Sequence, residues 1–258
     1  MILTKDAYFA PSDDIRRLHI WLPDEYAQTD DRYPVMYMFD GHNLFLDSDA
    51  TYGTCWGLKD FLLQWPKPVI CVGIECSHRG QERLSEYCPY DCHGGFLGTF
   101  HGIGEQTLAW IADTLKPEID RTYRTYSFRE ATGIGGSSMG GLMSLYGVVR
   151  YNQIFSKAAC LSSAVTPFQE QLLGDIRDAS LNPDTRVYLS WGEQEGRWQS
   201  EEQRDSLDTM LARCNHAIET ALCEQGITTM LTMQKNGGHC EADWAKQVPQ
   251  FMDFLWRS

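Results

Sequence analysis

Short apolar runs recur along the chain at lengths that predict β-strands. Residues 15–22 alternate roughly between apolar and polar positions, and residues 33–39 and 68–74 are almost continuously apolar. A continuous apolar run of this length is typical of a strand that is covered on both faces of a sheet. Further strands are predicted directly before Gly136 and at residues 157–162, 186–191 and 227–233.

Apolar residues at helical spacing lie between these strands. The pattern predicts helices at residues 56–64, 101–116, 139–149, 201–224 and 241–256, with Pro117 at the end of the second. Strands that alternate with helices imply a mostly parallel central sheet, flanked by helices on both faces. Since no repeat or linker divides the chain, we expect a single α/β domain over residues 1–258.

The overall charge narrows the classes of partner. The 258 residues carry a net charge of −13, which argues against binding to nucleic acid or to anionic membranes. No apolar run is long enough to span a bilayer and the first residues lack a signal-peptide pattern, so a cytoplasmic location is expected. The nine cysteines fit reduced thiols. Cys88, Cys92 and His93 could form part of a zinc site, but no second pair of ligands is evident, so we expect neither a metal nor a cofactor.

The segment around Ser138 has the pattern of a nucleophile elbow. Residues 136–140 read Gly-Ser-Ser-Met-Gly and join a predicted strand to a predicted helix. A serine at such a bend adopts a positive φ angle, and its flanks need residues without side chains, which Gly136 and Gly140 provide. The helix that follows directs free N–H groups toward the bend, where an oxyanion would form. We therefore interpret Ser138 as a candidate nucleophile.

Candidates for a base and an acid follow later strands in the order that such a hydrolase requires. A serine nucleophile needs a base, and that base needs an orienting carboxylate. The loop after residues 186–191 contains Glu193 and Glu195, and the loop after the last strand contains His239 behind two glycines. The carboxyl ends of parallel strands meet at one edge of a sheet, so these loops are expected to converge. His239 is the predicted base, and both glutamates stay open as the acid.

Two backbone N–H groups are needed to bind the oxyanion. One is expected from Met139, the residue after the nucleophile. The second is expected from His42, which follows the strand at residues 33–39, because Gly41 before it allows close approach of the backbone. The His42 imidazole is expected to shape the pocket without titrating in catalysis.

Several motifs together resemble one branch of the α/β hydrolases. Besides Trp56, they are DGHNLF at 40–45, VGIE at 72–75, ERLSEY at 82–87, LKPEID at 115–120, GGSSMGG at 135–141 and GGHCEADW at 237–244. Over nearly its whole length the sequence is similar to the esterase D-like branch, which includes feruloyl, acetyl-xylan and siderophore esterases.

The resemblance implies an α/β-hydrolase fold and hydrolysis of carboxylic esters through an acyl-serine. By position it assigns Ser138 as the nucleophile, His239 as the base and Glu195 as the acid, since this branch often has Gly-x-x-Glu after the corresponding strand. The N–H groups of Met139 and His42 would form the oxyanion hole, and His42 stands where many members have glutamine.

The natural ester is less narrowly defined. Trp56, Tyr90 and Trp198 lie in loops that could line an acyl or sugar pocket, whereas Arg83 and Tyr87 are expected to hold their loop through an ion pair and packing. We expect a serine esterase that acts on small acyl esters, such as acetylated or feruloylated carbohydrates. A thioesterase, an acyltransferase and a catalytically inert binding protein of the same fold stay open as alternatives, as does assembly into a homo-oligomer.

Overall fold

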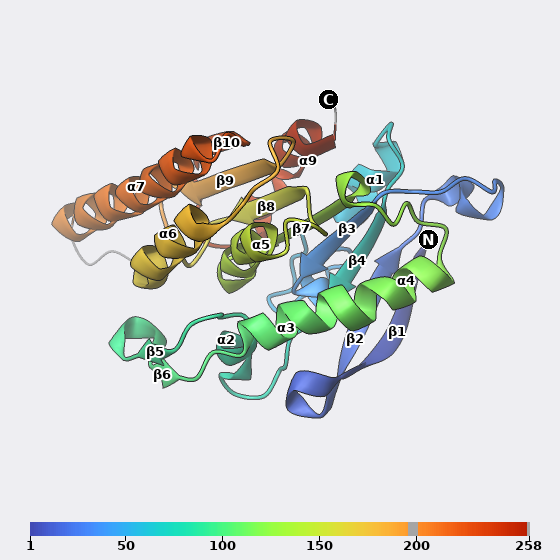
Figure 1. The fold of residues 1–258 in the computed structure, drawn as a ribbon, viewed down its shortest axis with the longest axis horizontal. Helices are drawn as coiled ribbons and strands as arrows, with labels where there is room; N and C mark the ends of the chain where they lie inside the picture. The colour runs from blue at the N-terminus through green and yellow to red at the C-terminus, as the bar shows by residue number, and fades with distance from the viewer. Residues whose placement is uncertain (196–200, 257–258) are drawn as a thin grey trace.

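The structure has one central sheet with helices on both faces (Figure 1). A computed structural model describes residues 1–195 and 201–256, with the backbone alone for 201–209. Within these residues, eight strands form the sheet in the order β1-β2-β4-β3-β7-β8-β9-β10. β1·β2 and β2·β4 are antiparallel, and the other neighbouring pairs are parallel. The strands are β1 Ile2–Phe9, β2 Asp14–Trp21, β3 Val35–Phe39, β4 Ile70–Ile74, β7 Thr132–Ser137, β8 Lys157–Leu161, β9 Arg186–Gly192 and β10 Thr228–Gln234.

The helices connect these strands, and a two-stranded hairpin lies outside the main sheet. None of the helices in the described part of the chain combines the length and the apolar character that a bilayer crossing requires. The helices are α1 Leu58–Gln64, α2 Glu82–Glu86, α3 Gly104–Trp110, α4 Lys116–Thr122, α5 Met139–Arg150, α6 Gln169–Asp178, α7 Glu201–Glu224, α8 Glu241–Ala245 and α9 Val248–Trp256, and the hairpin is β5 Cys92–His93 with β6 Thr99–Phe100.

The apolar side chains of the central strands enter two cores, one on each face of the sheet. Val35, Tyr37 and Phe39 of β3 pack into a core with α3, α5 and α6. Met36 and Met38, which point the other way because successive strand residues alternate, pack into a core with α1 and α9. The structure therefore confirms the predicted α/β class, a mostly parallel sheet flanked by helices on both faces.

The sequence pattern does not predict the edge strand β1, the helix α6, or the short elements α2, β5 and β6 between residues 82 and 100. β1 pairs with β2 alone at the edge of the sheet, and most of its side chains are exposed or half-buried. α6 buries only Leu172 and Ile176. Elements with so few covered positions lack the continuous apolar run or the full helical stripe that identifies the central ones.

Two of the predicted helices have different bounds in the structure, and each contains a proline in the first turn of one of its segments. The helix expected at 101–116 does not end before Pro117, but runs through a π-helical turn at Ile111–Leu115 into α4, which ends at Thr122. Pro117 lies in the first turn of α4, where its missing N–H is tolerated. The last predicted helix is divided into α8 and α9, and Pro249 likewise lies in the first turn of α9.

The carboxyl ends of the parallel strands meet at one edge of the sheet, as in other open α/β sheets. The chain leaves this edge after β3, β4, β7, β9 and β10. Each of these turns carries a polar or ionisable side chain, namely Asp40, Glu75, Ser138, Glu195 and His239. Residues far apart in the sequence are thereby brought to one place.

Candidate active site

Ser138 lies at a sharp bend between β7 and α5. Its backbone has φ 57° and ψ −122°, and its N–H donates a hydrogen bond of 3.0 Å to the carbonyl of Leu161 on β8. A Cβ atom added at Gly136 would lie 2.8 Å from the backbone of Gly140, so the bend has no room for a side chain there. The local backbone has the geometry of a nucleophile elbow.

His239 and Glu195 meet beyond the ends of β10 and β9. The Nδ1 atom of His239 lies 3.2 Å from Oε2 of Glu195. Glu195 is only 6% exposed, and its Oε1 accepts a hydrogen bond of 2.5 Å from the N–H of Gly192. Trp244 packs edge-on against the imidazole, with 5.1 Å between the ring centroids. The backbone thus holds one side of the carboxylate, while the other side can orient the imidazole.

The neighbouring glutamate, Glu193, makes a different contact. Its Oε2 accepts a hydrogen bond of 2.7 Å from the N–H of Asn236, in the loop that leads to His239. Glu193 therefore ties the loops after β9 and β10 together. Of the two candidates for the acid, the one in contact with the imidazole is Glu195.

Ser138 and His239 line the same cavity, which has a volume of about 420 Å³ and lies at the carboxyl ends of the strands. A cavity of this size is typical of sites for small molecules. Its walls bring ionisable groups from several turns next to the serine. Among the residues that line it are Asp40, His42, His78, Arg83, Glu241 and Trp244.

The two expected oxyanion donors belong to the first turns of helical segments. Met139 is the first residue of α5, and His42 lies within the 3-10 turn Gly41–Asn43 after β3. N–H groups in such positions have no acceptor within their own helix, so they are available to an oxyanion. A Cβ atom at Gly41 would lie 2.4 Å from the backbone of Gly73 on β4. The absence of a side chain lets this turn approach the sheet.

Asp40 and Arg83 form an ion pair beside this turn. The Nε and Nη2 atoms of Arg83 each donate a hydrogen bond of 2.7 Å to the Asp40 carboxylate, and the Asp40 N–H donates to the hydroxyl of Tyr87. Burial acts to raise the pKa of the Asp40 carboxyl, but the guanidinium outweighs burial and holds this pKa below its usual value. The ion pair expected for Arg83 therefore joins it to Asp40, the residue that begins the oxyanion turn.

Glu241 lines the cavity but is not among the site residues expected from the sequence. It is 6% exposed and accepts a hydrogen bond of 3.2 Å from the side chain of Asn43. Burial raises the pKa of its carboxyl, and the nearby Asp40 carboxylate adds to the increase. In the sequence it lies two residues after His239, within the GGHCEADW motif at 237–244.

Two of the three aromatic residues that were expected in a substrate pocket do not line the cavity. Trp56 is 3% exposed and packs in the core behind Trp244, with 5.9 Å between the rings. The hydroxyl of Tyr90 donates a hydrogen bond of 2.6 Å to Asp175, away from the cavity. A loop position does not reveal whether an aromatic ring turns inward, and here tertiary packing decides. Trp198 lies outside the described residues.

One group of side chains in the described part of the chain has the spacing of metal ligands. It consists of His42, Glu75 and His78, from the turns after β3 and β4. The zinc site considered at Cys88 and Cys92 is not such a group, and all nine cysteines, each within the described residues, are free thiols. The His42 imidazole is thus not an isolated ring beside the site, and burial lowers its pKa.

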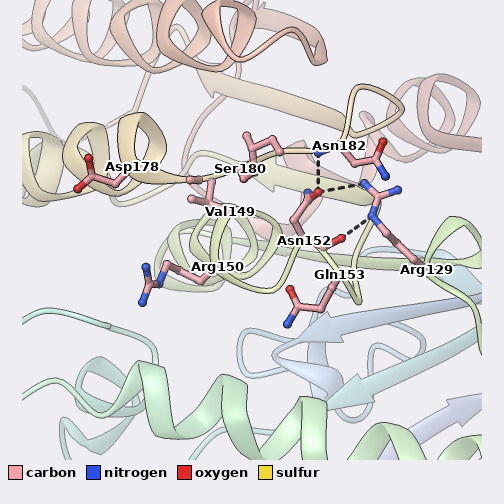
Figure 2. A pocket seen from close by; sticks show the side chains of 10 residues that line it. Arg129, Val149, Arg150, Asn152, Gln153, Asp178, Ser180 and Asn182 are labelled. Atoms are coloured by element: carbon pink, nitrogen blue, oxygen red, sulfur yellow. Dashed lines mark hydrogen bonds between the residues drawn. The ribbon is translucent and has the colours of Figure 1, made fainter.

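A second hollow, of about 570 Å³, lies where the chain enters β7 and β9 (Figure 2). Figure 2 shows Arg129 and the backbone N–H of Asn182 directed at the side-chain oxygen of Asn152, with hydrogen bonds of 3.3 and 2.8 Å. The described residues that line this hollow include no imidazole. The hydrogen bonds that Asn152 accepts there join the segments before β7 and β9.

The fold and the cavity define the class of protein, an α/β hydrolase with a serine, a histidine and a glutamate at the carboxyl ends of its strands. A family model described as "Putative esterase" matches residues 13–254. The chain belongs to this family and is a carboxylic ester hydrolase.

The chain is also similar to individual proteins, in sequence or in structure. The chain is 26% identical over 247 residues to the uncharacterized protein YbbA of Bacillus subtilis (strain 168), with 93% of this chain and 92% of YbbA covered. An IroE-like serine hydrolase from Shewanella oneidensis has a similar structure, with a TM-score of 0.74, 21% identity and coverage of 99% of this chain and 79% of that one. A ferulic acid esterase has a TM-score of 0.70 at 15% identity, with 100% and 98% covered. At these identities the structural likeness shows the fold.

Proposed function

We propose that this esterase cleaves its substrates through an acyl-serine formed on Ser138, with His239 as the base and Glu195 as the acid. The observation that carries the proposal is the position of Ser138. The residue stands at a positive-φ bend and lines one cavity with His239, whose Nδ1 contacts the buried Glu195 carboxylate. A nucleophile, a base and an orienting acid in this relation are the parts that acyl transfer requires.

In the proposed reaction the hydroxyl of Ser138 attacks the ester carbonyl and its proton passes to His239. Glu195 holds the imidazole in orientation and stabilises its charged form. The N–H groups of Met139 and His42 donate hydrogen bonds to the oxyanion. The tetrahedral intermediate then expels the alcohol, which takes the proton from His239. Water, activated by the same imidazole, hydrolyses the acyl-serine and restores the hydroxyl.

The proposed substrates are small acyl esters, including acetylated or feruloylated carbohydrates. A cavity of about 420 Å³ suits a substrate of this size. The structural likeness to a ferulic acid esterase supports a phenolic acyl group as one candidate. The cytoplasmic location and the oligomeric state stay predictions from the sequence.

The test is Ser138→Ala, measured on p-nitrophenyl acetate and on acetylated and feruloylated oligosaccharides. We expect loss of about 10³-fold or more in kcat, because the nucleophile is removed. Ser144→Ala is the matched control, since it removes a buried hydroxyl from the same region whose hydrogen bond is to the Gly140 carbonyl. A fluorophosphonate probe should label Ser138 in the wild type. Absent labelling together with unchanged turnover in Ser138→Ala would refute the acyl-serine mechanism.

A further inference from the structure

Imidazole and carboxylate side chains gather at the wall of the Ser138 cavity without any part in the proposed serine chemistry. His42 follows β3, and Glu75 and His78 follow β4, its neighbour in the sheet. One possible ligand atom from each of these three side chains lies within 4.8 Å of the others. His42 and His78 also line the cavity.

The His42 ring has one nitrogen without a partner. The residue is 7% exposed, and its Nε2 lies 3.0 Å from the hydroxyl of Thr51. Its Nδ1 is buried and has no hydrogen-bond partner among the described residues. A buried polar atom without a hydrogen-bond partner in the protein is uncommon in folded proteins. A cation bound to Nδ1 would supply the missing partner, while Thr51 holds the ring from the other side.

Glu75 is held from two directions. Its Oε1 lies 2.6 Å from Nε2 of His19, and its Oε2 lies 3.1 Å from Nε2 of His78. His19 is buried, and its other ring nitrogen lies 3.9 Å from a carboxylate oxygen of Asp49. Outer partners that orient the ligating side chains are a regular feature of metal sites. Here His19 would orient Glu75, and Thr51 would orient His42.

We propose that His42, Glu75 and His78 form a binding site for a divalent transition-metal ion of the Zn²⁺ class. Two imidazoles and one carboxylate are ligands that Zn²⁺ accepts, and three protein ligands leave a fourth position for water or an anion. The ion would take the place of the hydrogen bond between His78 and Glu75. The His78 side chain is 59% exposed, so the site is open to solvent. This proposal does not depend on the proposed serine mechanism, because it concerns other side chains and binding alone.

The experiment measures metal binding to the full chain after treatment with a chelator. Calorimetric titration with Zn²⁺ should show one saturable site, and Co²⁺ should give the visible d–d bands of four-coordinate nitrogen and oxygen ligation. His78→Ala removes an exposed ligand and should weaken Zn²⁺ binding by about tenfold or more. His101→Ala is the matched control, because His101 is also exposed and pairs with a carboxylate, Asp91 at 2.6 Å, outside the group. It should bind Zn²⁺ as the wild type does.

A second variant separates ligation from loss of the fold. Glu75→Gln keeps the shape of the side chain and removes its charge, so it should also weaken binding while the circular dichroism spectrum stays unchanged. If neither His78→Ala nor Glu75→Gln changes the Zn²⁺ affinity, the three side chains form only a hydrogen-bond network and the proposal is wrong. Thiolate charge-transfer bands with Co²⁺ would also overturn it, since they would place the metal on cysteines, of which Cys223 and Cys240 are exposed.

Discussion

Replacing Glu195 by glutamine should stop catalysis without disturbing the fold, because its two oxygens have different partners. Oε1 accepts a hydrogen bond of 2.5 Å from the N–H of Gly192, and Oε2 lies 3.2 Å from Nδ1 of His239. Glutamine has one oxygen and one NH₂ group in these places. An NH₂ group cannot accept the Gly192 N–H, so the amide oxygen takes that side. The NH₂ group then faces the imidazole.

With its NH₂ group toward the imidazole, the glutamine would stabilise the wrong tautomer of His239. The NH₂ group donates to Nδ1, so the ring proton must reside on Nε2, and the ring cannot accept the proton of Ser138. In a serine protease, the equivalent loss of the correct tautomer costs about 10⁴-fold in kcat. At about 1.4 kcal/mol for each factor of ten, the expected loss of transition-state stabilisation is about 5.5 kcal/mol.

Glu193→Gln is the matched control in the same loop. Its amide oxygen can still accept the N–H of Asn236, which Glu193 bonds at 2.7 Å. We expect kcat on p-nitrophenyl acetate to stay within about twofold of the wild type. Thermal unfolding of both variants checks that the fold is kept. If Glu195→Gln retains more than about a tenth of kcat, or if only Glu193→Gln is inactive, the assignment of the acid is wrong.

Two further predictions concern charges at buried or half-buried positions. Arg83→Met should lower the free energy of unfolding in urea by about 3 kcal/mol, because it leaves the Asp40 carboxylate buried without its cation. Adding Asp40→Asn should recover part of this loss, and an Arg83→Met variant as stable as the wild type would contradict the reasoning. Burial lowers the pKa of Lys157 from 10.5 to about 8, so between these values the unfolded chain binds more protons than the folded one. The free energy of unfolding should therefore rise with pH across that window relative to Lys157→Met, and a difference that does not change with pH would exclude this effect.

Much of the proposed site could be located from local sequence patterns. A tight strand-to-helix bend needs glycines at set positions, so the segment around Ser138 reveals its geometry without knowledge of distant residues. The two glycines before His239 and the helix after it likewise indicate a bend of the chain at that residue. Local patterns did not separate Glu193 from Glu195. Both follow the same strand, and the choice depends on which side chain the loop turns toward the imidazole.

Some predictions were wrong, and some elements were not predicted, because these features depend on packing between distant residues. Trp56 was expected near the substrate, but its ring is covered by Trp244 in the core, and no local pattern shows this. The edge strand β1 and the weakly striped α6 were missed for a related reason. Their few covered positions are set by neighbours that lie far away along the chain.

Local sequence patterns are enough to predict the α/β class, the order of the central strands and helices along the chain, and the bends at Ser138 and His239. These features follow from the periodicity of apolar residues and from glycines, which act over a few positions. That β4 lies between β2 and β3 is visible only in the folded sheet, and this order brings Glu75 next to both His19 and His42. The pairing of strands depends on contacts between distant residues, so neither the acid at the imidazole nor the group around Glu75 could be predicted from local patterns.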